Sequence, residues 1–250
     1  MPSSFQSAIR KALRANADPE VRENFQRYFK HVVKLVGVRS PEAKKVFREC
    51  FPLLAGSSVD SMIEQAFSLL ASEYLEEKQI GVSVLARIEK KLPADFVPRL
   101  EPVFDRSVYD WATCDTLSGR VLRYVLRRDD AARNRIIGWS KADYFWRQRS
   151  SAVTFVNEAR HGKFNDDILC VCRNIVDNPE RFVQLGMGWA IRELSLADQQ
   201  LALDFLSAHY PKISREGLRY AIEKMPAPLQ KRVLAEHTKA RNGTSVYKQA

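Results

Sequence analysis

The sequence predicts an all-α protein built from antiparallel helix pairs, and three observations lead to this prediction. Apolar residues recur with helical spacing almost from end to end of the 250 residues, and no stretch alternates in the manner of a β-strand. Residues that cap helix starts, some of them followed by proline, precede these stretches. The polar breaks between them are short, which is typical of helix hairpins.

The expected helices each begin at a capping residue. The first clear start is Asp18-Pro19, after which Val21, Phe25 and Tyr28 fall on one side of a helix. Ser40-Pro41 has the same form, with an N-cap oxygen before a proline. Further one-sided apolar stripes follow Ser58, Asp110, Asp143, Asn165, Asp198 and Ser214.

The helix pairs form repeats. When WATCDTLSGRVL, RSSAVTFV and GMGWAIREL are aligned, Asp115, Ala152 and Trp189 share one register, each 37 residues after the one before. A period of about 40 residues made of two helices is typical of a HEAT-like solenoid, which sets equivalent positions side by side. We therefore expect one domain over residues 1–238, followed by a basic, polar and disordered tail over 239–250.

The composition favours a polyanionic partner. There are 40 Lys and Arg against 30 Asp and Glu, a net charge of +10. Such an excess favours nucleic acid first and an acidic membrane surface second. No secretory signal is visible, and no stretch approaches the roughly 20 apolar residues of a membrane span. The four cysteines contain no CxxC pair and the histidines show no ligand spacing, so we expect a cytoplasmic protein without a metal site or disulfides.

Four side chains that could bind or catalyse lie at, or one turn before, equivalent positions of successive repeats. Trp111 and Asp115 are four residues apart, so they lie one turn apart on one helix face. Arg149 lies one turn before the register position of the next repeat, and Trp189 occupies that position in the repeat after it. Two indoles, a carboxylate and a guanidinium are therefore expected on one strip of surface.

The segments that carry these residues resemble a known family. QRYF from Gln26, WATCD from Trp111, FWRQR from Phe145 and GWAIREL from Gly188 are similar to the AlkD-type alkylpurine DNA glycosylases of the HEAT-like DNA alkylation repair family. The resemblance runs from about Phe25 to Met225, with the motifs in the family's order and at closely matching spacing. One departure is that the family's Trp-Trp pair is Asp110-Trp111 here.

The resemblance implies a C-shaped solenoid that holds double-stranded DNA in a basic concave groove. It implies hydrolysis of the N-glycosidic bond of N3- and N7-alkylated purines by a monomer, without metal or cofactor, as in base excision repair. Carried over by position, Asp115 matches the catalytic carboxylate and Trp111 and Trp189 match the aromatic residues beside the lesion. Arg149 matches an arginine that contacts the DNA backbone, and Tyr28 matches a tyrosine near the lesion.

The chemistry agrees with these residue types. An alkylated purine is a cation and a good leaving group, and the sugar left behind resembles an oxocarbenium ion that a fixed carboxylate stabilises. Indole faces attract cationic groups by about 0.5–2 kcal/mol. Guanidinium and ammonium groups would contact phosphates and make binding depend on salt. Candidates for these contacts, besides Arg149, are Arg120, Arg147, Arg160, Lys163 and Arg192.

Other interpretations stay open. The two tryptophans also suit a core between repeats, Asp115 a solvated carboxylate, and Arg149 a surface charge; Tyr28 lies on the apolar stripe of its helix and suits core or site equally. A DNA-binding or architectural protein that excises nothing would keep the same solenoid. A protein-interaction solenoid without any nucleic-acid role is the third possibility.

Overall fold

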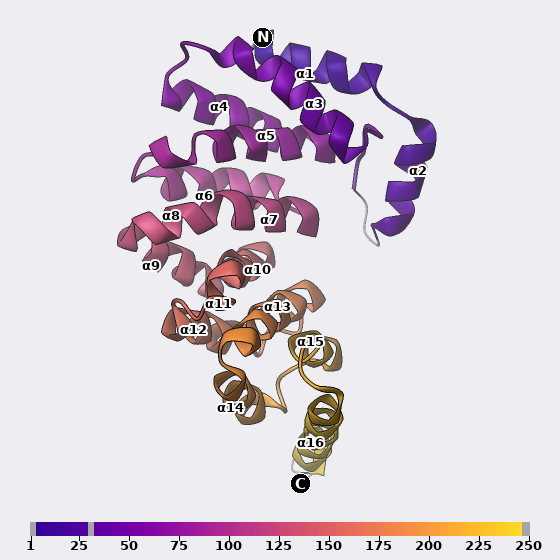
Figure 1. Ribbon diagram of the computed structural model, residues 1–250, viewed down its shortest axis with the longest axis vertical. Helices are drawn as coiled ribbons and strands as arrows, with labels where there is room; N and C mark the ends of the chain where they lie inside the picture. The colour runs from indigo at the N-terminus through magenta and orange to yellow at the C-terminus, as the bar shows by residue number, and fades with distance from the viewer. Residues whose placement is uncertain (1–3, 30–32, 247–250) are drawn as a thin grey trace. The chain divides into compact units, whose positions relative to one another are not determined.

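The chain folds into two compact helical units. The computed structural model describes residues 4–29 and 33–246. The contacts divide the chain into residues 1–132 and 133–250, which are described one at a time below. Both units consist of helices (Figure 1), and in the described residues the only β-type pairing is an isolated parallel bridge between Lys34 and Tyr74. The all-α prediction is confirmed, and a single domain over residues 1–238 stays a prediction.

The first unit stacks helices from the N-terminus onward. Helix α4 packs along α5, and α5 also contacts α3 and α7. A π-helical turn, η3, continues α7 directly into α8. The helices are α1 (Ser4–Ala15), α2 (Pro19–Tyr28), α3 (Ser40–Cys50), η1 (Phe51–Leu54), α4 (Val59–Leu70), α5 (Leu75–Arg87), η2 (Glu89–Lys91), α6 (Phe96–Ser107), α7 (Trp111–Leu117), η3 (Ser118–Leu122) and α8 (Arg123–Arg128).

The second unit is organised around α13, its longest described helix apart from α16. Helix α13 contacts α10, α11, α14 and α15. The boundary between the units falls inside α9 (Asp130–Gly138). The helices that follow are η4 (Trp139–Lys141), α10 (Phe145–Thr154), α11 (Val156–Ala159), α12 (Asn165–Ile175), α13 (Arg181–Ala197), α14 (Gln199–His209), α15 (Arg215–Ala221) and α16 (Ala227–Val246).

Most helix starts lie where the capping residues predict them. A side-chain oxygen accepts a hydrogen bond from a first-turn backbone N–H at Asp18, Ser58, Asp110, Asp198 and Ser214. Helix α3 differs by one residue, because Ser40 is its first residue and Arg39 takes the N-cap position without a side-chain hydrogen bond. Pro41 is compatible with either start, because neither of the first two helical N–H groups has a partner within the helix.

The prediction of a disordered C-terminal tail is wrong for residues 239–246. Helix α16 continues to Val246, and residues 247–250 lie outside the described part of the chain. Lys239, Ala240 and Arg241 are good helix formers, so they extend a helix that is already nucleated. Two hydrogen bonds to the Ile213 carbonyl, from His237 Nε2 and Arg241 Nη1, fasten this helix to the unit.

Glycines let α13 and α15 approach each other closely. A Cβ atom built on Gly188 would lie 2.5 Å from the Gly217 carbonyl oxygen, and one built on Gly217 would lie 2.9 Å from the Gln184 carbonyl oxygen. Neither backbone can accept a methyl group without moving. The pair therefore fixes the distance between the helices next to Trp189, which directly follows Gly188.

We expect Gly188→Ala to destabilise the protein by about 1–3 kcal/mol, the usual cost of an overpacked core. The added methyl must push the backbone of Gly217 away, which outweighs the gain of roughly 0.5–1 kcal/mol that alanine brings to a helix. Urea unfolding followed by circular dichroism measures the change. Gly138→Ala on α9 is the control, because nothing lies within 4 Å of its Cβ position. Equal stability of the two variants would contradict the close approach.

Candidate nucleic-acid interface

Three aromatic rings meet at the start of α7 in the first unit. The Trp111 ring centroid lies 5.7 Å from that of Tyr28 and 5.2 Å from that of Phe29. Phe29, the C-cap residue of α2, is buried and packs with Val33 and Leu35, whereas Tyr28 is 66% exposed. The choice left open for Tyr28 is thus decided in favour of the surface. An exposed tyrosine over a half-buried indole is a surface on which a base or sugar can pack.

Asp115 lies on the same helix as Trp111, one turn later. The Asp110 carboxylate caps this helix by accepting a 2.7 Å hydrogen bond from the Thr113 backbone N–H, which places Trp111 at the first helical position. Asp115 is partly exposed. The π-helical turn begins three residues after Asp115, and such turns recur at functional sites. Trp111 and Asp115 thus lie on one helix, while the catalytic role of Asp115 stays a prediction.

A buried glutamate that the sequence analysis missed holds the segment behind the aromatic rings. The Glu76 carboxylate accepts hydrogen bonds from three consecutive backbone N–H groups, those of Val36 at 2.9 Å, Gly37 at 2.8 Å and Val38 at 3.1 Å. Gly37 has a φ of 98°, which glycine adopts without strain. Leu35, directly before this segment, packs in one cluster with Phe29 and Trp111, so Glu76 holds a segment that adjoins the aromatic rings.

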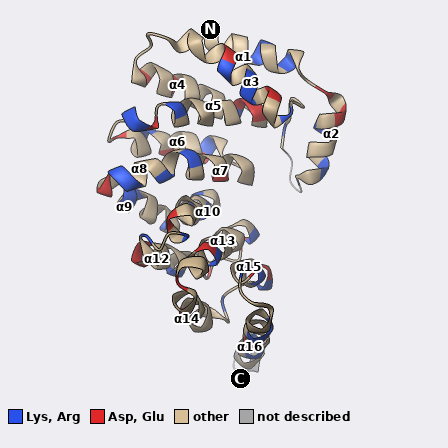
Figure 2. Ribbon diagram, viewed as in Figure 1, with Lys and Arg blue, Asp and Glu red and all other residues tan. Residues whose placement is uncertain are grey.

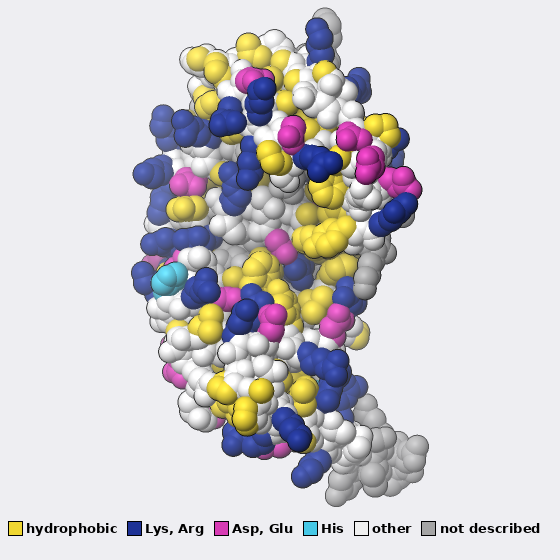
Figure 3. Space-filling model, turned by 45° about the vertical axis from the view of Figure 1, so that its right-hand side comes forward, with side chains coloured by type: hydrophobic (Ala, Val, Ile, Leu, Met, Phe, Trp, Pro, Cys, Tyr) yellow, Lys and Arg dark blue, Asp and Glu magenta, His cyan; other side chains and the backbone are white. Residues whose placement is uncertain are grey.

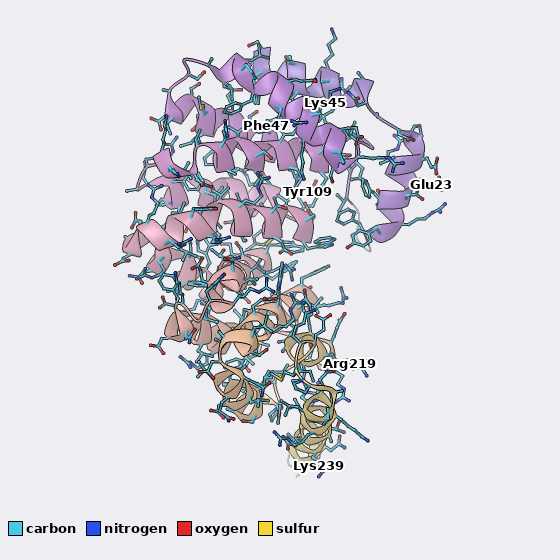
Figure 4. All side chains as sticks on the ribbon, viewed as in Figure 1. Glu23, Lys45, Phe47, Tyr109, Arg219 and Lys239 are labelled. Atoms are coloured by element: carbon cyan, nitrogen blue, oxygen red, sulfur yellow. The ribbon has the colours of Figure 1, made fainter. Side chains whose placement is uncertain are left out.

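A buried lysine lies beside the cap of α7. Lys78 on α5 is 1% exposed and donates a hydrogen bond to the Ser107 carbonyl oxygen. Its Nζ atom also lies 3.5 Å from the centre of the Tyr109 ring, and Tyr109 (labelled in Figure 4) donates a hydrogen bond to the Glu73 carbonyl oxygen. Burial lowers the pKa of Lys78 to about 8, and the negative charge of Asp110 opposes this shift.

We expect this lysine to make stability rise with pH. Between the folded pKa of about 8 and the ordinary value of 10.5, the unfolded chain binds more protons than the folded protein. The free energy of unfolding therefore increases as pH rises through this window. Lys78→Met has similar length and no titrating group. Urea unfolding at several pH values should show the wild type gaining stability relative to Lys78→Met, and a constant difference would contradict the lowered pKa.

Arg149 lies inside the second unit, on α10. Its side chain is buried, with 5% of the residue exposed, and Nη1 donates a 2.7 Å hydrogen bond to the Phe182 carbonyl oxygen at the start of α13. A Cβ atom on Gly186 would lie 3.1 Å from Arg149 Cγ, so this glycine makes room for the arginine. In this arrangement the guanidinium joins α10 to α13. Its predicted contact with the DNA backbone remains untested.

Trp189 belongs to a second aromatic group, on α13 and α15. Its ring lies 6.5 Å from that of Tyr220, and the Arg192 guanidinium lies 4.7 Å from the Tyr220 ring centre. Arg192 also pairs with Glu193 and Glu223, both at 2.6 Å, and its side chain is 14% exposed. Arg192 therefore takes part in a network of charges that orders the surface around the partly exposed Trp189.

The other basic candidates differ in how they are held. Arg120 donates a 3.2 Å hydrogen bond to Ser83 Oγ, and Arg147 lies 5.5 Å from the Trp139 ring centre. Arg160 pairs with Glu193 at 3.4 Å but keeps 60% of its side chain exposed. Lys163 is exposed. Arg120, Arg160 and Lys163 thus present charge to solvent, as a phosphate contact requires.

Basic side chains are spread over much of the described surface. Figure 2 shows Lys and Arg on most helices. Arg127 and Arg128 lie in the last turn of α8. On the face shown in Figure 3 they lie over large areas, with fewer acidic side chains between them. In the part of the chain that the structure describes, no three His, Cys, Asp or Glu side chains come together as metal ligands, and no helix is long and apolar enough to cross a membrane.

The predicted site residues fall into both units. Tyr28, Trp111 and Asp115 belong to the first, and Arg149 and Trp189 belong to the second. Within the second unit, α10 and α13 pack side by side, as the repeat register predicts for the helices of Ala152 and Trp189. The common surface strip for all of these residues stays a prediction.

The fold and surface define an all-α helical-repeat protein with many exposed basic side chains, and with an exposed tyrosine beside a half-buried tryptophan of the helix that carries Asp115. Residues 9–225 match the family model of the DNA alkylation repair enzymes. The chain therefore belongs to the DNA alkylation repair enzyme family, which assigns it to the repair of alkylated DNA.

A solved structure shows the same fold. It is described as a predicted DNA alkylation repair enzyme from Enterococcus faecalis, and it is similar to this chain with a TM-score of 0.75. The two are 14% identical, and the match covers 85% of this chain and 98% of the other. No curated protein matches the chain.

Proposed function

We propose that this protein is a DNA glycosylase that hydrolyses the N-glycosidic bond of N3- and N7-alkylated purines in double-stranded DNA. The observation that carries the proposal is the placement of Asp115 one turn after Trp111 on α7. The Trp111 ring itself contacts the exposed Tyr28 ring, and the chain belongs to the DNA alkylation repair enzyme family. An enzyme of this kind would act as a monomer in the cytoplasm, on the DNA of the nucleoid.

The reaction needs little beyond these groups. Alkylation leaves the purine positively charged, so the electrons of the C1′–N bond move to the base as the bond breaks, and the base departs neutral. The sugar becomes an oxocarbenium-like cation, which a carboxylate at Asp115 stabilises electrostatically. The oxygen of a water molecule then bonds to C1′, and one water proton passes to the carboxylate or to solvent.

The aromatic residues hold the nucleotide during this step. Trp111 and Tyr28 offer π-faces to a cationic sugar and base, a contact of about 0.5–2 kcal/mol. We propose a similar role for Trp189, the other tryptophan that the resemblance matches to an aromatic residue beside the lesion. The exposed Arg120, Arg160 and Lys163 suit contacts with the phosphates. We propose a contact with the DNA backbone for Arg149 as well, whose guanidinium also joins α10 to α13.

Base release from methylated duplex DNA tests the proposal. The protein is incubated with DNA treated with a methylating agent, and free 3-methyladenine and 7-methylguanine are measured by chromatography and mass spectrometry. Release above the level of a matched incubation with Asp115→Asn supports the glycosylase. Tight, salt-sensitive DNA binding without base release would replace it with a DNA-binding protein that excises nothing.

A further inference from the structure

A pocket lies beside the candidate site, entirely within the first unit. Its volume is about 310 Å³, and side chains from α2, α3, α5 and the α7–η3 helix line it. This volume is at the lower end of the roughly 300–1,000 Å³ that small-molecule sites occupy. The size suits a small ligand. Its walls include Phe25, Phe29 and Phe47, and we call it the aromatic pocket.

The aromatic pocket adjoins the face of α7 that carries the proposed catalytic residues. Ala112, Thr116 and Arg120 line it, spaced four residues apart along α7 and η3. Each of the first two directly follows a site residue, since Trp111 precedes Ala112 and Asp115 precedes Thr116. Neighbouring residues of a helix point about 100° apart, so the pocket opens on the adjacent face of the same helix.

The walls of the aromatic pocket suit a flat ring. Phe29 is shared with the candidate site, because its ring also packs against Trp111 at 5.2 Å. Phe47, labelled in Figure 4, contributes a second ring from α3. Aromatic rings bind flat heterocycles by stacking or by edge-to-face packing. A heteroaromatic base can therefore pack against these rings.

One polar side chain on the lining offers hydrogen bonds to such a ring. Gln79 on α5 lines the aromatic pocket, and within the described residues its side-chain amide has no hydrogen-bonding partner. A carboxamide carries both donors and an acceptor, and it is the group that pairs with the edge of adenine in DNA recognition. Glu76 also lines the pocket, but its carboxylate is already bonded to three backbone N–H groups.

The charges at the lining select for a neutral ligand. Lys44 and Arg120 are exposed and positively charged, whereas the buried Glu76 carboxylate is already engaged by three backbone N–H groups, so the lining disfavours a cationic alkylated base that is still attached to DNA. Once the glycosidic bond has broken, the same base is neutral and the repulsion disappears. The lining thus distinguishes the leaving group from the substrate.

We propose that the aromatic pocket binds a free purine base, and that it receives the base released in the reaction at Asp115. That the base comes from the glycosylase reaction rests on the proposed function, whereas the binding of free base to the pocket does not. The purine packs against the phenylalanine rings, and the Gln79 amide bonds to its polar edge. Free base bound in the aromatic pocket would then slow turnover without preventing the binding of DNA.

Binding of free base in the absence of DNA tests this proposal. The probe is 3-methyladenine, its affinity is measured by calorimetry, and its position is followed through the side-chain amide signals of Gln79 in NMR spectra. We expect saturable one-to-one binding that shifts these signals, and weaker binding of cytosine, whose single ring leaves part of the pocket unfilled. No shift of the Gln79 signals up to the solubility limit of the base would overturn the proposal.

Variants separate the pocket from other sites. Ala43→Phe fills the pocket from α3 and should abolish binding, while Lys45→Phe places the same ring on the same helix at a position that does not line the pocket and should leave binding unchanged. Gln79→Leu keeps the size of the side chain and should weaken binding roughly three- to tenfold, the value of one or two net hydrogen bonds. Wild-type affinity in both Ala43→Phe and Gln79→Leu would reject the aromatic pocket as the site.

The result is independent of the proposed function. A protein that binds 3-methyladenine in this pocket yet releases no base from methylated DNA contradicts the glycosylase alone. A protein that releases base yet gives no binding contradicts the pocket alone.

Discussion

Asp115→Asn should lower the single-turnover rate of base release by about 10²- to 10³-fold, the usual cost of removing one preorganised electrostatic group. Asparagine keeps the size and hydrogen-bonding capacity of the side chain but has no charge to stabilise the cationic sugar. The affinity for duplex DNA should barely change, because the lost interaction strengthens only as the bond breaks. Quench-flow or manual sampling with excess enzyme over a 3-methyladenine-containing duplex gives the rate.

Asp166→Asn serves as the control for this measurement, since it removes one carboxylate from the exposed first turn of α12 in the second unit. It should excise at the wild-type rate. Unchanged excision by Asp115→Asn, with DNA binding intact, would show that Asp115 is not the catalytic carboxylate. A slow spontaneous loss of the cationic base sets the lower limit in every sample.

Duplex affinity should fall on the order of 10³-fold between low and moderate salt, if six or more phosphates are engaged. The net charge of +10 and the exposed Lys and Arg side chains provide the contacts. Fluorescence anisotropy with a labelled duplex, measured over a series of salt concentrations, gives the slope of log affinity against log salt. Damaged and undamaged duplexes should share this slope.

Single substitutions show which side chains contribute to the dependence of DNA affinity on salt. Lys163→Gln should reduce it by about 0.9, the contribution of one phosphate contact. Arg149→Ala should weaken binding to damaged and undamaged duplex alike, and since the guanidinium bonds to the Phe182 carbonyl it should also lower the unfolding temperature. A flat salt response would reject a phosphate-contacting surface altogether.

The local features of the fold could be predicted from the sequence. Helical periodicity predicts the all-α class, and capping residues such as Ser58 and Asp198 mark helix starts, because both signals act over a few residues. The start of α3 was misplaced by one residue, since Pro41 tolerates both positions. The helical end of α16 was missed because contacts to the distant Ile213 carbonyl hold it.

The candidate site could be predicted from the sequence only in part. The four-residue spacing of Trp111 and Asp115 guarantees a common face on any helix, so that pairing was predictable. Burial of Arg149 depends on the absent side chain of Gly186 on another helix, and the aromatic pocket depends on four segments that meet only in the folded chain. Such non-local arrangements leave no pattern in a single sequence.

The three hydrogen bonds from residues 36–38 to Glu76 should slow the exchange of their amide hydrogens with solvent. Irregular connections between helices normally exchange their amide hydrogens quickly, because water reaches them without any unfolding. The N–H groups of Val36, Gly37 and Val38 are instead held by a carboxylate on the buried face of α5, so deuterium enters them only when that region opens. Residues 36–38 should therefore exchange as slowly as helical amides, although they belong to no helix.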